Sequence, residues 1–418
     1  MNPNSERRPV FNTKDLLFMG ATVLLASQWA ILRFAYPHLG VPWTPLMPGI
    51  AIFAAAYLLS WSAEVAQHDI PPALALAALA LVAVLPEYAV DIYFAWTAGK
   101  DPSYIPYATA NMTGANRLLI GLGWPVIVFV YWLKTRRSEV ELDRRLDLET
   151  GVLLVATLYS FVIPFKHTLS LWDAAFFIGL FLWYFFRILR GKVEAPEELE
   201  GPPGMISSWS PLWRRITAIV LFLLAAGVIY LAAEPFAEGI LEIGRQWGVE
   251  EFVLVQWLAP LASESPEFIV AILFALRAKP NAAFNTLISS KVNQWTLLVG
   301  MLPVAYFISH AMSGQMGHAM ELDARQVEEI FLTGAQSLFA VVVLSDRRFS
   351  LKEALTLFVL FFLQAAYPAV EKQVGIDSIH VRMGFAWMYV GLSGGIVITS
   401  KRFRENLVNL GRVFIGKR

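Results

Sequence analysis

The chain has 418 residues, of which 57% are hydrophobic and 13% aromatic, and its mean hydropathy is positive. The formal net charge is zero, so composition gives no sign of a nucleic-acid partner. There is no cysteine, which excludes disulfides and thiolate metal sites. This composition predicts an all-α polytopic membrane protein.

Apolar segments of about 20 residues, divided by Pro, Gly and charge, predict about twelve transmembrane helices. The first apolar run follows a polar N-terminus and has no cleavage-site pattern after it, so we expect a retained span rather than a signal peptide. In chain order the predicted spans are Leu16–Phe34, Leu46–Val65, Ala73–Ala98, Ile105–Leu133, Thr150–Pro164, Leu171–Leu189, Ile216–Gly239, Glu251–Leu276, Ala282–Ile308, Val327–Leu344, Ala354–Tyr367 and Met383–Ser400.

The distribution of Lys and Arg supports this count. With the N-terminus inside, the strongest basic clusters all fall in predicted cytoplasmic segments, as the positive-inside rule requires. One such cluster is the C-terminal tail from Lys401. The sequence therefore predicts a multi-pass protein of the plasma or inner membrane with both termini in the cytoplasm.

Two stretches, residues 80–119 and 258–297, repeat the same features in the same order. Each has Pro-Glu inside an apolar run, then a short polar hairpin, then a second apolar run that opens with Asn and carries a base six residues later. The matching pairs are Glu87 and Glu267, Asn111 and Asn285, and Arg117 and Lys291. The predicted spans give the two copies opposite orientations. Inverted repeats are typical of secondary transporters that work by alternating access.

The repeats also predict the domain organisation. We expect a first repeat of five helices at 46–190, a cytoplasmic linker at 191–213, and a second, inverted repeat of five helices at 214–370. Residues 1–45 and 371–418 each add one helix outside this ten-helix core.

The repeated stretches contain the candidate cation ligands. An ionisable side chain in hydrocarbon costs several kcal/mol, so it first indicates a functional site. Proline inside a helix frees backbone carbonyls, and hard cations such as Ca²⁺ and Na⁺ prefer oxygen ligands. The candidate ligands are Glu87, Asp91, Glu264, Glu267, Asn111, Asn285, Ser263, Ser289 and Asn293. For each Ser and Asn, an interhelical hydrogen bond is an equally good interpretation.

The two bases, Arg117 and Lys291, leave three interpretations open. They can pair with Glu87 or Glu267, and a buried Lys could then carry the exchanged proton. They can be structural counter-charges to Asp91 and Glu264. They can also bind an anionic substrate.

The repeats resemble the alpha-repeats of the sodium/calcium exchanger (cation/calcium antiporter) superfamily, with a Gly-Thr-Ser-x-Pro-Glu helix and a Gly-Asn-x-x-Gly-Ser-Asn helix in each half. Residues 83–87 and 262–267 are similar to the first signature, and residues 110–116 and 284–290 to the second. The resemblance implies a ten-helix core that exchanges Ca²⁺ for Na⁺ or H⁺, with Glu87 and Glu267 as central metal ligands.

This chain departs from the signatures at several positions. Ala83 and Val84 replace the Thr-Ser pair, Glu264 stands in place of a Ser, and Ala115 replaces the Ser of the second signature. Ligands for additional Na⁺ ions are therefore missing.

These features predict a secondary active antiporter that exchanges a cation, Ca²⁺ above all, for H⁺ or Na⁺. Two alternatives are a non-transporting membrane sensor or partner-binding subunit, and an anion or organic-solute carrier that uses the two bases. No enzyme motif is present in the sequence, and we expect no enzymatic activity and no resident cofactor. The expected partners are the lipid bilayer and small inorganic cations.

Overall fold

The computed structural model describes residues 12–35, 42–66, 85–190, 201–314, 319–374 and 377–399, together with a few single residues near these ranges. Almost all of the described chain is helical, and its helices fall into two compact units. One unit comprises residues 1–93 and 185–254, and the other comprises residues 94–184 and 255–418.

The first unit contains α1 (Thr13–Ala35), α2 (Trp43–Ala66), α10 (Gly201–Ser207) and α11 (Pro211–Trp247). Small residues allow α2 and α11 to approach closely. A Cβ on Gly239 would lie 2.7 Å from the backbone nitrogen of Pro45, and a Cβ on Gly49 would lie 2.9 Å from the ring of Phe236. Each of these two helices is the first of a predicted repeat.

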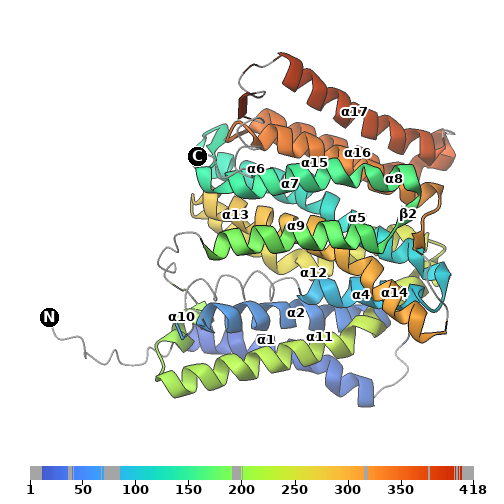
Figure 1. The fold of residues 1–418 in the computed structure, drawn as a ribbon. Helices are drawn as coiled ribbons and strands as arrows, with labels where there is room; N and C mark the ends of the chain where they lie inside the picture. Colours follow the sequence, from blue (N-terminus) through green and yellow to red (C-terminus); the bar gives the residue numbers. More distant parts are fainter. Residues whose placement is uncertain are drawn as a thin grey trace. The chain divides into compact units, whose positions relative to one another are not determined.

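The second unit contains most of the remaining helices. The helix α15 lies beside α5, α7 and α17 (Figure 1). The helices that lie wholly in this unit are α5 (Ile105–Leu118), α6 (Trp124–Thr135), α7 (Asp147–Ser160), α8 (Val162–Lys166), α13 (Pro280–Asn293), α14 (Val299–Met312), α15 (Ala324–Leu344), α16 (Leu351–Val374) and α17 (Ser378–Thr399). The helices that begin in one unit and end in the other are α4 (Leu85–Ala98), α9 (Leu171–Leu189) and α12 (Glu251–Leu276).

Shorter elements connect these helices. The 3-10 turns are η1 (Pro102–Tyr104) and η3 (Arg144–Leu146), and the π-helical segments are η2 (Leu119–Gly123) and η4 (Gln294–Leu298). Four short strands pair as two antiparallel ribbons, β1 (Glu139–Glu141) with β4 (Arg348–Ser350) and β2 (Thr168–Leu169) with β3 (Met320–Glu321).

The membrane-spanning character of the fold is confirmed. Among the described residues, ten helices are long and apolar enough to cross a bilayer, and the bent α12 makes eleven. The bounds of α9 and α12 coincide with the predicted spans. Of the predicted span Ala73–Ala98, only the part from Leu85 is described, so the count of twelve stays a prediction.

The predicted repeat boundaries do not coincide with the compact units, because each unit contains helices from both halves of the chain. The predicted linker 191–213 contains α10 and the start of α11. Both helices begin inside the predicted linker because proline occupies their first positions. Proline is favoured at the start of a helix, where its missing N–H would have no intrahelical partner. The acidic residues of the linker, Glu194, Glu197, Glu198 and Glu200, lie outside the described residues.

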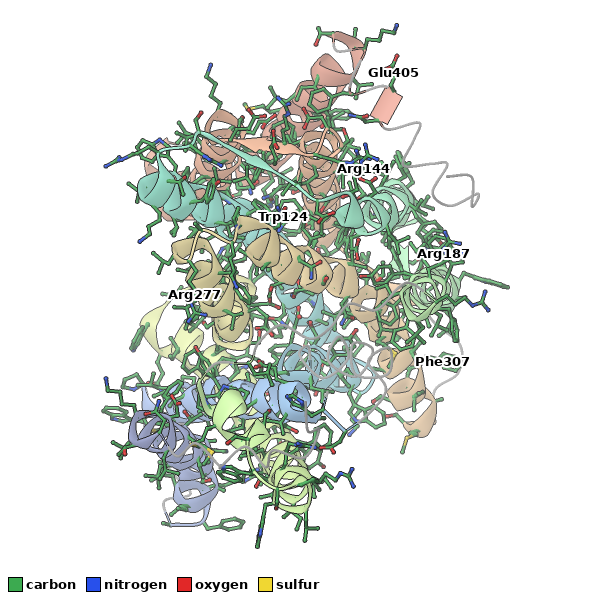
Figure 2. All side chains as sticks on the ribbon, turned by 90° about the vertical axis from the view of Figure 1, so that its left-hand side faces the viewer. Trp124, Arg144, Arg187, Arg277, Phe307 and Glu405 are labelled. Atoms are coloured by element: carbon green, nitrogen blue, oxygen red, sulfur yellow. The ribbon has the colours of Figure 1, made fainter. Side chains whose placement is uncertain are left out.

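The second unit has an interior of buried side chains and a periphery of exposed ones. In Figure 2, Trp124 is enclosed by neighbouring helices, whereas Arg144 and Arg277 lie at the edge. Trp124 is fully buried, and both arginines are exposed. Both arginines also lie beyond the ends of spans, where water can solvate their charges.

An ion pair at one end of the first unit ties α2 to α11. The Arg214 guanidinium donates to both carboxylate oxygens of Asp69, over 2.7 and 2.8 Å, and Arg215 donates over 2.8 Å. The hydrogen bonds from Arg214 lower the pKa of Asp69 to about 2, although partial burial opposes this shift. Two-point binding of a carboxylate by Arg is among the stronger polar contacts.

The Asp69→Asn variant should therefore unfold at a lower temperature than the wild type at neutral pH, by about 2 kcal/mol in free energy of unfolding. Because the folded-state pKa lies below the unfolded value of about 4, this stabilisation is complete above pH 4 and is lost as the pH falls towards 2. Thermal unfolding of the purified protein across this range measures the effect. A difference between the two proteins that stays constant down to pH 2 would contradict it.

Candidate functional site

The first acidic helix, α4, carries two buried carboxylates in the first unit. Glu87 is 2% exposed and Asp91 is 0% exposed. They are four residues apart and so share one face of the helix. Tyr93 on the same helix donates a 2.8 Å hydrogen bond to Glu238 of α11, which helps to hold α4 within the first unit. Both carboxylates predicted as ligands in this repeat are thus inside the protein.

The second acidic helix, α12, is broken where its sequence carries Pro266. The segments Glu251–Ser265 and Glu267–Leu276 meet at an angle of 58°. Proline removes a backbone hydrogen bond and clashes with the preceding turn, which accounts for a sharp bend at this position. Glu264 lies before the bend and Glu267 directly after it. The sequence places Pro266 inside the predicted span Glu251–Leu276, and the bend lies at this proline.

The carboxylate of Glu264 is bound by the helix that follows. Ser290 Oγ donates to Glu264 Oε2 over 3.4 Å, and Gln294 Nε2 donates to Glu264 Oε1. Gln294 also donates to Ser290 over 3.3 Å. In contrast, the Oε2 atom of Glu267 is buried and has no hydrogen-bond partner in the described part of the chain. Of the two carboxylates predicted as ligands in the second unit, Glu267 therefore has an oxygen available for a ligand.

The predicted neutral ligands differ in their surroundings. Along α13, Asn285 is exposed, Ser289 is half-buried and Asn293 is 3% exposed, so these three predicted ligands, spaced four residues apart, run from the surface into the interior. Asn111 of α5 is fully buried, and neither atom of its amide has a hydrogen-bond partner within the described ranges. Ser263 donates to the carbonyl of Ala259 within its own helix, over 3.2 Å.

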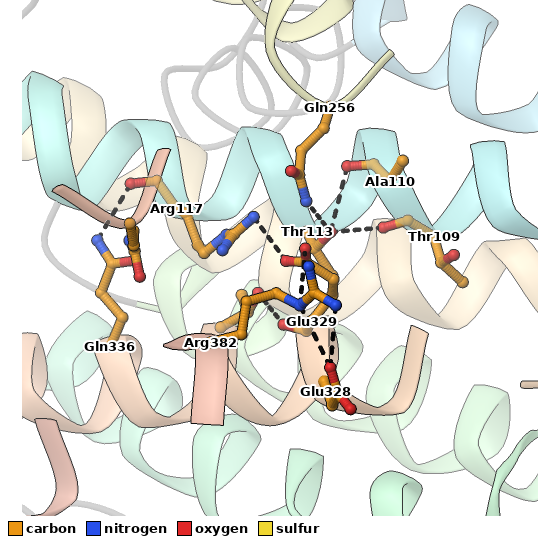
Figure 3. Close-up of polar contacts among 11 residues, drawn as sticks. Thr109, Ala110, Thr113, Arg117, Gln256, Glu328, Glu329, Gln336 and Arg382 are labelled. Atoms are coloured by element: carbon orange, nitrogen blue, oxygen red, sulfur yellow. Dashed lines mark hydrogen bonds and ion pairs between the residues drawn. The ribbon is translucent and has the colours of Figure 1, made fainter. Parts of the chain in front are cut away.

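Both predicted bases are buried in the second unit. Lys291 Nζ donates to the side-chain and backbone oxygens of Asn116, over 2.7 and 3.3 Å, and lies 4.5 Å from the ring centroid of Trp295. Arg117 forms a 2.7 Å ion pair with Glu329 of α15, as Figure 3 shows. Lys291 thus links α13 to α5, and Arg117 links α5 to α15.

Four of the residues that organise this region were not among the predicted site residues. Glu329 binds Arg117, Arg382 binds Glu328 and approaches Glu329, and Gln294 binds Glu264. A signal for the two glutamates was present, because Glu328 and Glu329 form an acidic pair inside the predicted span Val327–Leu344. Gln294 could have been found from its spacing, since it follows Ser290 by four residues on the polar face of the helix.

In each repeat, the helix that follows the acidic helix has the same interruption. In the first repeat α5 passes through the π-helical η2 into α6, and in the second α13 passes through the π-helical η4 into α14. Each π segment is five residues long and begins a few residues after the base, Arg117 or Lys291. Single π turns within α-helices occur frequently at functional sites. This shared interruption supports the predicted repeat.

The arrangement can bind a cation through oxygen atoms but does not form a preassembled metal centre. Within the described ranges, no group of three or more His, Cys, Asp or Glu side chains is placed to hold a metal ion. The second unit supplies Glu264, which Ser290 contacts over 3.4 Å, and Glu267, and Ca²⁺ accepts mixed sets of carboxylates and neutral oxygens. Buried carboxylates on two membrane helices, α4 and the broken α12, are typical of a membrane transport protein.

Comparison with known proteins identifies the family. A profile of the sodium/calcium exchanger protein family matches residues 41–190 and 217–369. A crystal structure of the H⁺/Ca²⁺ exchanger CAX is 44% identical, over 96% of this chain and 98% of that chain, with a TM-score of 0.88. The chain belongs to the sodium/calcium exchanger family, a family of transporters, and the resemblance inferred from its motifs is confirmed.

More distant structures share the fold alone. The Ca²⁺/H⁺ antiporter protein YfkE is 15% identical over 84% of this chain and all of that chain, with a TM-score of 0.57. The sodium-calcium exchanger NCX_Mj is 15% identical over 82% of this chain and 98% of that chain, with a TM-score of 0.51. None of the curated proteins compared with this chain matches it.

Proposed function

We propose that this protein is a secondary active antiporter that exchanges Ca²⁺ for H⁺ across a membrane by alternating access. The observation that carries the proposal is the 44% identity, over almost the whole chain, to an H⁺/Ca²⁺ exchanger. The buried carboxylates of both repeats are the chemical basis, since a carboxylate is both a Ca²⁺ ligand and a proton acceptor. The non-transporting and anion-carrier alternatives are not favoured by these similarities.

Several residues of the site favour H⁺ over Na⁺ as the coupled ion. The signature hydroxyls are replaced by Ala83 and Val84, which lie outside the described residues, so the first repeat offers fewer neutral oxygens for Na⁺. Glu264 adds a carboxylate instead. A proton and a Ca²⁺ ion that compete for the same buried carboxylates are coupled without a separate site for the second ion.

The proposed roles of the individual residues rest on the family resemblance and on the burial of each side chain. As the family resemblance implies, Glu87 would be the central ligand of the first repeat, with Asp91 and Asn111 as further oxygen donors. Glu267 would be the central ligand of the second repeat, with Glu264 and the neighbouring Ser and Asn side chains as further donors. Lys291, held by Asn116, would compensate part of the negative charge. We further propose that both termini face the cytoplasm, that the bilayer and inorganic cations are the partners, and that no resident cofactor is needed.

A transport assay tests the proposal. Purified protein in proteoliposomes with an acidic interior should take up radioactive calcium, and a protonophore that collapses the pH gradient should stop this uptake. A Na⁺ gradient of the same size at equal pH on both sides is the matched control and should drive no uptake.

The outcomes separate the alternatives. Uptake driven by Na⁺ at constant pH would contradict H⁺ coupling, although it would leave the protein a cation antiporter. Calcium-dependent thermal stabilisation without any counterflow would identify a binding subunit. Transport of an anion that Lys291→Met abolishes would identify an anion carrier.

A further inference from the structure

Four charged side chains inside the second unit form a continuous buried line across three helices. Arg117 of α5 pairs with Glu329 of α15 at 2.7 Å, and Arg382 of α17 pairs with Glu328 of α15 at 3.1 Å. Arg382 also lies 3.8 Å from Glu329, so the two pairs are joined (Figure 3). Two positive and two negative charges leave the group neutral.

This group is enclosed by protein. The side chains of Arg117 and Glu329 are 3% and 4% exposed, and those of Arg382 and Glu328 are 12% and 11% exposed. Removing one partner of such a buried pair leaves a charge that neither water nor protein compensates. Glu329 is the carboxylate that neutralises Arg117, and Arg382 comes from the predicted extra helix outside the ten-helix core.

The position of Arg117 relates this group to the broken acidic helix. Its guanidinium carbon lies 4.9 Å from the ring centroid of Trp257 on α12. Trp257 precedes Glu264 by seven residues, which is two turns, so both lie on one face of α12 about 10 Å apart along its axis. In the low dielectric of a membrane protein, an uncompensated positive charge at that range opposes the binding of a divalent cation.

We propose that Glu329 is a positioning residue that sets the cation affinity of the site. Assisted by Arg382, it holds Arg117 against Trp257 and neutralises it, so that Glu264 and Glu267 keep their attraction for Ca²⁺. The helix α17 thereby contributes to ion binding without touching the ion. This inference rests on the proposed function, because it concerns the same site.

Measuring the concentration dependence of calcium exchange tests the inference. The Glu329→Gln variant should raise the KM for Ca²⁺ about tenfold, because Arg117 keeps its charge and loses its partner. The double variant Arg117→Gln/Glu329→Gln removes both charges and should restore the wild-type KM to within about threefold. A merely structural defect would reduce the number of active molecules, and hence the maximal rate, without changing the KM of those that remain.

Glu328→Gln is the matched control. Glu328 is the same residue type on the same helix and contacts Arg382. Because Glu329 remains beside Arg117 in this variant, the KM for Ca²⁺ should change less than in Glu329→Gln.

Several results would overturn the inference. An unchanged KM in Glu329→Gln would show that the charge of Arg117 does not reach the cation site. A double variant with a raised KM or no exchange would show that Arg117 itself acts in transport, and this test holds even where Glu329→Gln alone fails to fold. A wild-type protein that moves no calcium would instead contradict the proposed function.

Discussion

The Glu267→Gln variant will lose calcium exchange. Glutamine has nearly the same size as glutamate, but its amide carries no negative charge and cannot take up a proton at neutral pH. Glu267 follows the 58° bend of α12, and its Oε2 atom is buried without a hydrogen-bond partner in the described part of the chain. Loss of residues that only support metal ligands costs about 10- to 100-fold, so loss of a ligand should lower the exchange rate at least about a hundredfold.

The control for this variant is Glu251→Gln, the same substitution at the start of the same helix. Glu251 accepts a 3.0 Å hydrogen bond from Arg245 and lies four turns from the bend. This variant should keep exchange near the wild-type rate, and calcium flux in proteoliposomes measures both proteins. If Glu267→Gln exchanged calcium as fast as Glu251→Gln, Glu267 would not be a ligand.

Local features of the sequence predicted the helices and the break. The spans Leu171–Leu189 and Glu251–Leu276 were predicted at their observed bounds, because each is a long apolar run between polar or turn-forming residues. The break in α12 followed from Pro266 alone. Helix bounds and proline bends depend on residues that are neighbours in the chain, so a single sequence is enough to predict them.

The contacts of the bases could not be predicted in the same way. The partner of Arg117 is Glu329, more than two hundred residues away, and the packing of α15 against α5 brings them together. The acidic pair Glu328 and Glu329 lies near the start of its predicted span, where a charged side chain commonly reaches the interface. In the structure, Glu329 instead faces the interior and is 3% exposed.

The π-helical segments were also not predictable from the sequence. A π turn inserts one residue into the helical hydrogen-bond pattern without a required residue type, and Leu119–Gly123 and Gln294–Leu298 have only leucine in common. Their similar places, two residues after Arg117 and three after Lys291, support the predicted repeat with a backbone feature in addition to the motif residues.

Substituting Gly114 should be the most destabilising single change among the small residues of α5. A Cβ at this position would lie 1.8 Å from the backbone carbonyl oxygen of Gln256 on α12, and 2.7 Å from its carbonyl carbon. A backbone atom cannot move aside as a flexible side chain can, so Gly114→Ala must push α5 and α12 apart. Overpacking typically costs about 1–3 kcal/mol, and a clash with backbone should reach at least the upper end of that range.

The same displacement should also impair transport. Thr113, beside the glycine, accepts a 3.4 Å hydrogen bond from Gln256, and Asn116, two residues on, binds Lys291. Separating the helices would weaken both contacts. We therefore expect Gly114→Ala to lower the unfolding temperature by several degrees and to reduce calcium exchange in the protein that still folds.

Gly179→Ala on α9 is the matched control for Gly114→Ala. A Cβ on Gly179 would meet no atom within 4 Å, so alanine there should leave stability unchanged or raise it by up to about 1 kcal/mol through its higher helix propensity. Thermal unfolding of the two purified variants gives the comparison. Equal unfolding temperatures would show that α5 and α12 can separate at no cost, and that their close approach does not hold the second acidic helix in place.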